Sequence, residues 1–320
     1  MQILITGSAG FIGFNLAKYL LEKSNVRIIG IDSLNNYYSK KLKKDRIKEL
    51  LKFKRFSFFH TNILNKKKVE KIFKIKKIDY VINLAAQAGV RYSLEKPNEF
   101  VDNNIQGFYN LIDVAKNFKI KKFIYASSSS IYGDSKKFPL KETQNVKPKN
   151  IYALSKKINE DISLIFNKYY KLKSTGLRFF TVYGEWGRPD MMLLKFIESF
   201  YKKKIFYLYN FGKHSRDFTY IGDVVKILYL LLKKHSSLGT NDIFNICSNK
   251  SVDLDKIIFF FKKNNIIPKI KKISIQKADI IKTHGDNSKL CKTINYKKFS
   301  DWKISLLKLI KWYKVFYKFK

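Results

Sequence analysis

A tyrosine and a lysine four residues apart, Tyr152 and Lys156, are the pair in this chain best suited to acid–base chemistry. They lie in a helical pattern that begins after Pro148, and positions i and i+4 share one face of a helix. An ammonium group beside a phenol stabilises the phenolate, which can then serve as a general base near neutral pH. We therefore expect both residues to be catalytic.

A run of four serines at positions 127–130 supports this interpretation. Tyr-x-x-x-Lys alone is weak evidence, because the chain has 20 tyrosines and 65 lysines and arginines. The serines, however, follow a predicted strand. A hydroxyl at this position could bind the substrate oxygen that Tyr152 deprotonates.

Three of the 14 glycines fall at positions 7, 10 and 13, between a strand-like run and a helical pattern. Glycines at this spacing allow a tight turn and let backbone N–H groups approach a pyrophosphate, which the helix N-terminus also attracts. Asp32 ends the next predicted strand, 19 residues after Gly13. An acid at this distance binds the adenosine ribose 2′-hydroxyl and repels a 2′-phosphate, so we predict NAD as the cofactor.

Small residues at the end of a later predicted strand, Leu84, Ala85 and Ala86, suit a chain segment that lies against a cofactor. Plain close packing explains them equally well, so the sequence leaves both interpretations open.

The elements that must position these residues alternate between short apolar runs and helical patterns. Predicted strands cover residues 3–6, 26–31, 56–60, 80–84, 123–127 and 174–180, with helices such as 11–23 and 104–118 between them. This order predicts an α/β fold, a Rossmann-type doubly wound parallel sheet. We expect an NAD-binding domain at 1–175, to which residues of about 215–245 return, and a smaller C-terminal substrate-binding lobe within 176–320. Residues 189–201, 221–234 and 303–319 are predicted to be helical.

The formal net charge of +40 is large, but the lysines are spread along the whole chain. No local basic patch with interleaved aromatic residues stands out, so we expect no nucleic-acid partner. Only seven basic residues are arginines, which makes each a candidate for two-pronged binding of phosphate or carboxylate.

The remaining composition points to a cytoplasmic protein. No apolar run is long enough to span a membrane and no signal peptide is recognisable. Two cysteines without metal-type spacing argue against disulfides and a metal site. The four histidines, at positions 60, 214, 235 and 284, are scattered without ligand spacing, so we expect them to be structural.

Over nearly its whole length the sequence resembles the extended short-chain dehydrogenases of the nucleotide-sugar epimerase branch, most closely UDP-glucuronate 4-epimerases. The motifs that carry the resemblance are Asn36-Tyr37-Tyr38 with Leu42, Lys43 and Arg46; AAQAGVRYS at 85–93; SSSSIYG at 127–133; Tyr152 to Lys156 with Asn159 and Glu160; TGLRFFTVYG at 175–184, continuing through Trp186 to Met191; and RDFTYI at 216–221.

The resemblance implies roles for individual residues. Tyr152 would be the acid/base, Lys156 its partner, and Ser128 would orient the sugar C4 hydroxyl. Together with the glycine loop, it implies an NAD site formed by Gly7, Gly10, Phe11, Ile12, Gly13, Asp32, Asn62, Ile63, Leu84, Ala85, Ala86, Asn103, Tyr152, Lys156 and Phe180. It implies a nucleotide-sugar site formed by Arg91, Ser128, Ser129, Thr181, Arg188, Arg216 and Asp279, with Ser130 beside it.

The implied reaction is NAD-dependent 4-epimerisation of a UDP-hexuronate through a transient 4-keto sugar. Tyrosinate takes the O4 proton while NAD accepts hydride from C4 and returns it to the opposite face, so the cofactor is recycled. Ser129 and Ser130 stand where related dehydratases and decarboxylases carry acidic residues, which argues against those activities. The resemblance also implies a homodimer formed through the Tyr152 helix.

Two alternatives stay open. One is a 4-epimerase of UDP-glucose or a UDP-N-acetylhexosamine, which Arg188 discriminates if it binds the hexuronate carboxylate. The other is a non-catalytic nucleotide- or RNA-binding protein of the same fold. Three departures from the family pattern bear on affinity: Asn62 replaces Asp, Glu185 replaces Pro, and residues 276–279 read Gln-Lys-Ala-Asp where the family has Gln-Pro-Gly-Asp.

Overall fold

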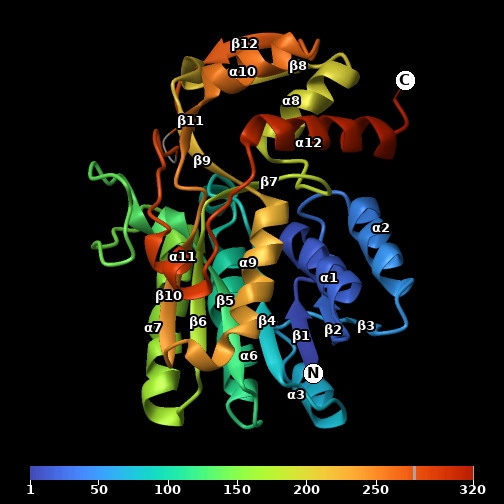
Figure 1. The fold of residues 1–320 in the computed structure, drawn as a ribbon, viewed down its shortest axis with the longest axis vertical. Coiled ribbons are helices and arrows are strands. Elements are labelled where there is room, and N and C mark those ends of the chain that lie inside the picture. The colour runs from blue at the N-terminus through green and yellow to red at the C-terminus, as the bar shows by residue number, and fades with distance from the viewer. Residues whose placement is uncertain (277–278, 320) are drawn as a thin grey trace.

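A seven-stranded parallel sheet forms the centre of the protein in a computed structural model that describes residues 1–276 and 279–319 (Figure 1). Its strand order is β10-β6-β5-β4-β1-β2-β3. The strands are β1 (Gln2–Thr6), β2 (Arg27–Asp32), β3 (Phe56–His60), β4 (Tyr80–Asn83), β5 (Lys122–Ser128), β6 (Ser174–Phe179) and β10 (Asn241–Ile246). The sheet confirms the predicted doubly wound α/β fold.

Helices cover both faces of the sheet, which explains why its strands are nearly continuous apolar runs. In β1, Ile3 and Ile5 pack on one face while Leu4 packs on the other, as the pleat of a strand requires. The first face is covered by α1 (Phe11–Lys23), α2 (Lys40–Leu51), α9 (Ile221–Lys233) and α11 (Ser288–Ile294). The second is covered by α3 (Lys66–Ile75), α6 (Gly107–Ala115) and α7 (Ile151–Tyr170).

The strand order reverses at β1, which lies between β2 and β4. Chains that leave neighbouring strands in opposite directions open a crevice at the carboxyl ends of a parallel sheet. The glycine loop follows β1, and the serine run begins at the end of β5. Both predicted sites therefore lie at the same edge of the sheet.

A smaller lobe lies above this edge in Figure 1. It contains a three-stranded sheet, β11-β9-β7, and a two-stranded sheet, β12-β8. Its strands are β7 (Thr181–Tyr183), β8 (Ile205–Tyr209), β9 (Ser215–Tyr220), β11 (Ser251–Asp253) and β12 (Lys269–Ile273). The helices α8 (Met192–Tyr201), α10 (Leu254–Lys263) and α12 (Trp302–Phe316) enclose a separate apolar core, in which the rings of Phe196 and Phe261 stack.

The segment after β4 contains one short helix and then a continuous helical stretch that becomes π-helical in its middle and runs into α6. It consists of α4 (Tyr92–Glu95), α5 (Pro97–Phe100) and a π-helical segment, Val101–Gln106. The helix predicted at 104–118 is therefore part of a longer helical stretch that ends at Ala115, and Asn103 and Asn104 lie in its π-helical segment. Such segments are frequent at functional sites because they re-aim side chains.

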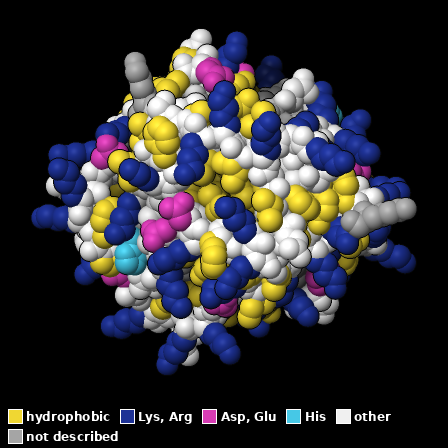
Figure 2. All heavy atoms as spheres, turned by 90° about the horizontal axis from the view of Figure 1, so that it is seen from above, with side chains coloured by type: hydrophobic (Ala, Val, Ile, Leu, Met, Phe, Trp, Pro, Cys, Tyr) yellow, Lys and Arg dark blue, Asp and Glu magenta, His cyan; other side chains and the backbone are white. Residues whose placement is uncertain are grey.

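The basic residues do not gather on the face that carries the lobe. Figure 2 shows this face from above, with lysine and arginine side chains scattered among hydrophobic and acidic ones. Within residues 1–276 and 279–319, no helix is both long and apolar enough to cross a membrane.

Candidate active site

A cavity of about 890 Å³ lies at the carboxyl edge of the main sheet and extends to residues of the lobe. Its walls contain 21 of the 22 residues predicted for the cofactor and substrate sites. Ser129 is the exception. The chain turns after β5 into a 3₁₀ segment, Ser129–Tyr132, and within it Ser130 rather than Ser129 lines the cavity.

The glycine loop between β1 and α1 has no room for side chains. Gly7 has a φ of +70°, a conformation that side chains disfavour, and a Cβ there would lie 2.8 Å from the backbone of Leu84 and Ala85. A Cβ on Gly13 would overlap the Gly7 carbonyl oxygen. The first turn of α1 contains no acidic residue, so its N-terminus is open to an anion. This cradle fits the pyrophosphate of a dinucleotide.

Asp32 is fixed at the end of β2 by two backbone donors. Its carboxylate accepts hydrogen bonds from the N–H groups of Ala9, at 3.0 Å, and Leu34, at 2.8 Å. Burial raises the pKa of Asp32, while these bonds and the charge of Lys43 oppose the rise. The bond to Ala9 ties the ribose-binding acid predicted from the sequence to the phosphate-binding loop.

Tyr152 and Lys156 occupy consecutive turns of α7, and both line the cavity. The Asn150 side chain caps this helix by accepting a hydrogen bond from the Ala153 N–H at 2.9 Å. The Lys156 ammonium is buried and donates to the Ala126 carbonyl at 3.0 Å. Burial lowers the pKa of Lys156 from 10.5 to about 8, so it remains mostly protonated at neutral pH.

Ser128 ends β5 and reaches the cavity beside this pair. Its Oγ accepts from the Ser130 N–H at 3.2 Å and donates to the Ser130 Oγ at 3.2 Å. The edge of the Phe100 ring packs against Tyr152, with 6.1 Å between the ring centroids. A phenol, an ammonium group and a serine hydroxyl therefore line the same cavity.

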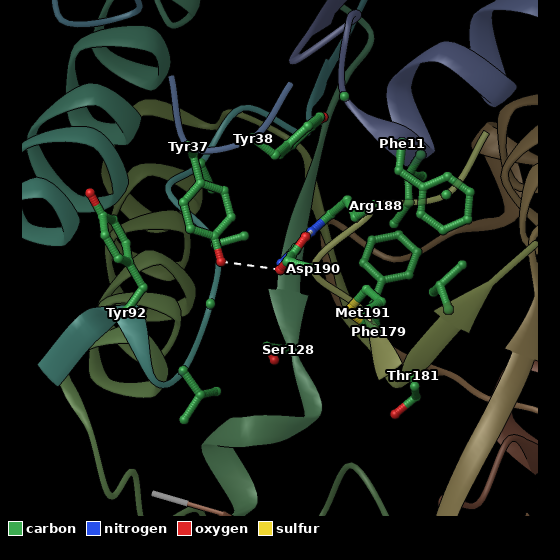
Figure 3. Close-up of a pocket in the computed structure, with 18 of the residues that line it drawn as sticks. Phe11, Tyr37, Tyr38, Tyr92, Ser128, Phe179, Thr181, Arg188, Asp190 and Met191 are labelled. Carbon is green, nitrogen blue, oxygen red and sulfur yellow. Dashed lines mark hydrogen bonds and ion pairs between the residues drawn. The ribbon is translucent and has the colours of Figure 1, made fainter. Parts of the chain in front are cut away.

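Arg188 is held by an acid that the sequence analysis did not single out. Its Nε donates to Asp190 Oδ1 at 3.1 Å and its Nη2 to Asp190 Oδ2 at 2.5 Å. The Tyr37 hydroxyl also donates to Asp190 Oδ2, at 3.1 Å, and Figure 3 shows the two side chains facing each other across the cavity. A guanidinium has two usable edges, and Asp190 occupies the Nε edge. The Nη1 edge remains for another carboxylate or phosphate.

A second group of arginines lies where β9 and the chain near residue 279 meet the cavity. Arg91 grips Asp279 through Nε, at 3.1 Å, and Nη2, at 2.8 Å, and stacks over the Tyr209 ring at 3.9 Å. Arg216 donates to the carbonyls of Ser215 and Ile281, and burial lowers its pKa to about 10. Two guanidinium groups near one carboxylate leave excess positive charge, which suits a diphosphate.

Two further arginines support the site without lining it. Arg46 is buried and donates to the carbonyls of Ala9 and Gly187, which connects the glycine loop to the Arg188 loop. Arg178, which its position in a predicted substrate motif had marked, forms a buried pair with Glu160 beneath the cavity. The scarcity of arginine in the chain does not distinguish such structural pairs from ligand contacts, because both require a planar guanidinium.

Residues that depart from the family pattern either line the cavity or form hydrogen bonds within the protein. Asn62 lines the cavity and accepts from the Leu64 N–H at 2.9 Å. Glu185 accepts from the Tyr220 hydroxyl at 3.0 Å, which gives its carboxylate a partner inside the protein. Gln276 and Asp279 line the cavity, whereas positions 277 and 278 lie outside the described residues.

Several lining residues were not predicted: Lys43, Tyr37, Asp190 and His214. Tyr37 and Lys43 fall within the motif at 36–46, and Asp190 falls within the motif at 188–191, so these motifs could have indicated all three residues. His214 had no such signal, because Arg91 and Asp279, which lie near it in the structure, are distant in sequence.

Comparison with known proteins agrees with this geometry. Residues 3–247 match the NAD dependent epimerase/dehydratase family. The chain is 38% identical to Protein CapI of Staphylococcus aureus, over 99% of this chain and 100% of that protein. It is 36% identical to UDP-glucuronate 4-epimerase 4 of Arabidopsis thaliana, over 99% of this chain and 76% of that protein.

A similar solved structure is that of UDP-glucuronic acid 4-epimerase from Bacillus cereus in complex with UDP-glucuronic acid and NAD. It superimposes with a TM-score of 0.92 and 30% sequence identity, over 99% of this chain and 100% of that one. The similarity therefore extends through the lobe as well as the main sheet.

Proposed function

The chain belongs to the NAD-dependent epimerase/dehydratase family, and from this premise we propose that it interconverts UDP-glucuronate and UDP-galacturonate by inverting C4. One observation carries the proposal: Tyr152, Lys156 and Ser128 line the same cavity as the glycine cradle and the arginines. A nucleotide cofactor and a nucleotide sugar can therefore both reach the acid–base pair.

The residues of this chain have separate tasks in such a reaction. Bound NAD, held by the glycine loop and Asp32, supplies reversible redox chemistry at the sugar carbon. Tyr152 removes the O4 proton and later returns it, while the Lys156 ammonium stabilises the phenolate. Ser128 holds the O4 oxygen in place.

The charged groups at the far end of the cavity position the substrate. Arg216 and Arg91 bind the diphosphate, and the Nη1 edge of Arg188 binds the hexuronate carboxylate. Anchoring the diphosphate and the sugar carboxylate keeps the reacting carbon near Tyr152 while it changes configuration.

Purified protein tests the proposal directly. Incubated without added NAD, it should convert UDP-glucuronate to UDP-galacturonate, and denaturation should release NAD, which is identified by mass. Tyr152→Phe should lower kcat by at least about 100-fold, the range found when a general base is removed, and should retain the bound NAD. Turnover of UDP-glucose without turnover of UDP-glucuronate would refute the hexuronate assignment.

One observation favours a neutral sugar as the second candidate. Asp190 already balances the charge of Arg188, so a substrate without a carboxylate would leave no buried charge unpaired. A 4-epimerase of UDP-glucose or a UDP-N-acetylhexosamine uses the same chemistry at Tyr152. Parallel assays with the three nucleotide sugars separate these activities.

We also propose that the enzyme is a homodimer. Apolar side chains are exposed on α7 and on the adjoining turn and helix: Leu154, Ile165, Val101 and Tyr109. Leu154 and Ile165 are 11 residues apart, or three turns, and lie on one face of α7. Ile165→Glu should yield a monomer in light scattering, whereas Ile304→Glu, at an exposed position on α12, should leave the dimer intact.

The division of labour along the chain is part of the same proposal. Residues 1–175, together with the segment of about 215–245, would bind the cofactor, and most of 176–320 would bind the sugar nucleotide. We place the enzyme in the cytoplasm, in keeping with its free cysteines, Cys247 and Cys291.

A further inference from the structure

His214 is a buried histidine in the wall of the cavity whose Nε2 has no hydrogen-bond partner among the residues that the structure describes. Only 7% of the residue is exposed. Buried polar atoms are nearly always paired, so an unpaired one on a residue that lines a cavity indicates a missing partner. The proposed catalytic reaction gives this residue no role.

The charged groups around His214 come from three parts of the chain. His214 directly precedes β9, and Arg216 follows two residues later, on the same side of an extended chain. Asp279 Oδ2 lies 3.9 Å from His214 Nε2 and 2.8 Å from Arg91 Nη2. Asp255 of α10 lies beside Gly212, two residues before His214.

These neighbours keep the imidazole neutral when no ligand is bound. Burial lowers the pKa of His214, the charges of Arg216 and Arg91 lower it further, and Asp279 opposes them. A neutral imidazole between two arginines cannot attract an anion strongly. A protonated one can, and an anion placed beside it would favour that protonation.

We propose that His214 is a third ligand of the substrate diphosphate, beside Arg216 and Arg91, and that it takes up a proton when the diphosphate binds. The inference rests on the proposed function for the presence of a nucleotide diphosphate. It adds a ligand and makes substrate affinity depend on pH. Binding of the diphosphate raises the pKa of His214 above its value in the free protein. Substrate affinity therefore increases as the pH falls from the pKa of the complex toward the pKa of the free protein.

The experiment measures binding of UDP-glucuronate by calorimetry to Tyr152→Phe protein, which does not turn it over. The diphosphate of a nucleotide sugar has no titrating group between pH 6 and 8, so any change in this range comes from the protein. Affinity should be about tenfold higher at pH 6 than at pH 8. Adding His214→Gln should abolish most of this dependence and weaken binding at pH 6 to its pH 8 level.

Two controls isolate the contact. Uridine, which lacks phosphate, should bind with the same affinity at both pH values. His235→Gln should behave as the parent protein, because His235 packs against Tyr80 and does not line the cavity. The buffer dependence of the binding enthalpy at pH 7 should show proton uptake in the parent and not in the His214→Gln protein.

The outcomes separate this inference from the proposed function. If UDP-glucuronate binds but the pH dependence survives in His214→Gln, or the variant loses affinity equally at both pH values, the proton-linked contact is wrong. If no nucleotide sugar binds at either pH, the proposed function fails and the inference fails with it.

Discussion

Asp190 binds one edge of the Arg188 guanidinium with both of its carboxylate oxygens. Nε of Arg188 donates to Oδ1 at 3.1 Å, and Nη2 donates to Oδ2. The pair is partly buried, and the Tyr37 hydroxyl holds the acid from the other side. This arrangement fixes the direction of the Nη1 edge. The substrate contact proposed for Arg188 therefore depends on Asp190 for its direction.

Substitution of this pair should affect hexuronates selectively. Arg188→Ala should raise KM for UDP-glucuronate by about 10- to 100-fold, the value of a charge-assisted hydrogen bond, and change KM for UDP-glucose little. Asp190→Asn, which keeps the size but loosens the grip, should raise the same KM several-fold. Steady-state kinetics on both substrates give the comparison, with Arg27→Ala on the exposed start of β2 as the control. Equal losses on the two sugars would contradict a carboxylate contact.

Much of the main sheet is predictable because its signals are local. β1 and β4 are short apolar runs buried on both faces, and the glycine loop needs only strand, turn and helix in succession. Tyr152 and Lys156 also meet within one helix.

The unpredicted parts depend on contacts between distant segments. β8 pairs with β12, and Ile205 and its partner Lys269 are 64 residues apart in the chain. Three lysines in β12 obscure the alternation expected of a strand. His214 becomes notable only when Arg91 and Asp279 reach it. Motif and composition made Arg178 a candidate ligand of phosphate or carboxylate, but in the structure it forms an ion pair with Glu160. Residue type limits the interactions that a side chain can make, and tertiary contacts determine which of these interactions it makes.

The glycine loop should tolerate no side chain at position 13. A Cβ on Gly13 would overlap the Gly7 carbonyl oxygen. The position of a Cβ is fixed by its own backbone and the carbonyl is part of the backbone, so neither group can move away. Gly13→Ala protein should therefore be purified with little or no nucleotide. The amount of NAD released on denaturation measures this, relative to protein concentration.

Gly239→Ala is the matched control for the loop. Its Cβ would meet only the flexible Asp242 side chain, at 3.0 Å, away from the cavity. This variant should retain the nucleotide content of the parent protein. Retention of NAD in the Gly13→Ala protein would show that the loop is not the pyrophosphate site.

Lys156 should reduce stability at neutral pH as a consequence of its function. Folding buries its ammonium and lowers its pKa from 10.5 to about 8, so between these values the unfolded chain holds more protons than the folded one. Its contribution to the free energy of unfolding therefore rises with pH in that window, by about 2 to 3 kcal/mol between pH 7 and pH 10.

Urea denaturation of nucleotide-free protein at these two pH values measures the effect. The parent should gain about 2 to 3 kcal/mol relative to Lys156→Met over this range, because the variant has no ammonium to bury. Lys48→Met, on the exposed side of α2, should show no such difference from the parent. A constant difference between parent and Lys156→Met would mean that folding does not lower the pKa of Lys156.

The buried pair of Arg178 and Glu160 should be the most costly to break. Arg178 binds both oxygens of Glu160, and the Ser127 hydroxyl donates to the same carboxylate at 2.6 Å, next to Ser128. Arg178→Met leaves the Glu160 charge buried without a cation, which should cost about 3 to 5 kcal/mol in urea unfolding. Glu198→Gln, which breaks the exposed pair with Lys202, should cost less than about 1 kcal/mol.

Because removing both charges avoids an uncompensated ion, Arg178→Met/Glu160→Met should be more stable than Arg178→Met alone. If the double variant were the less stable one, desolvation of Glu160 would not be the cause of the loss.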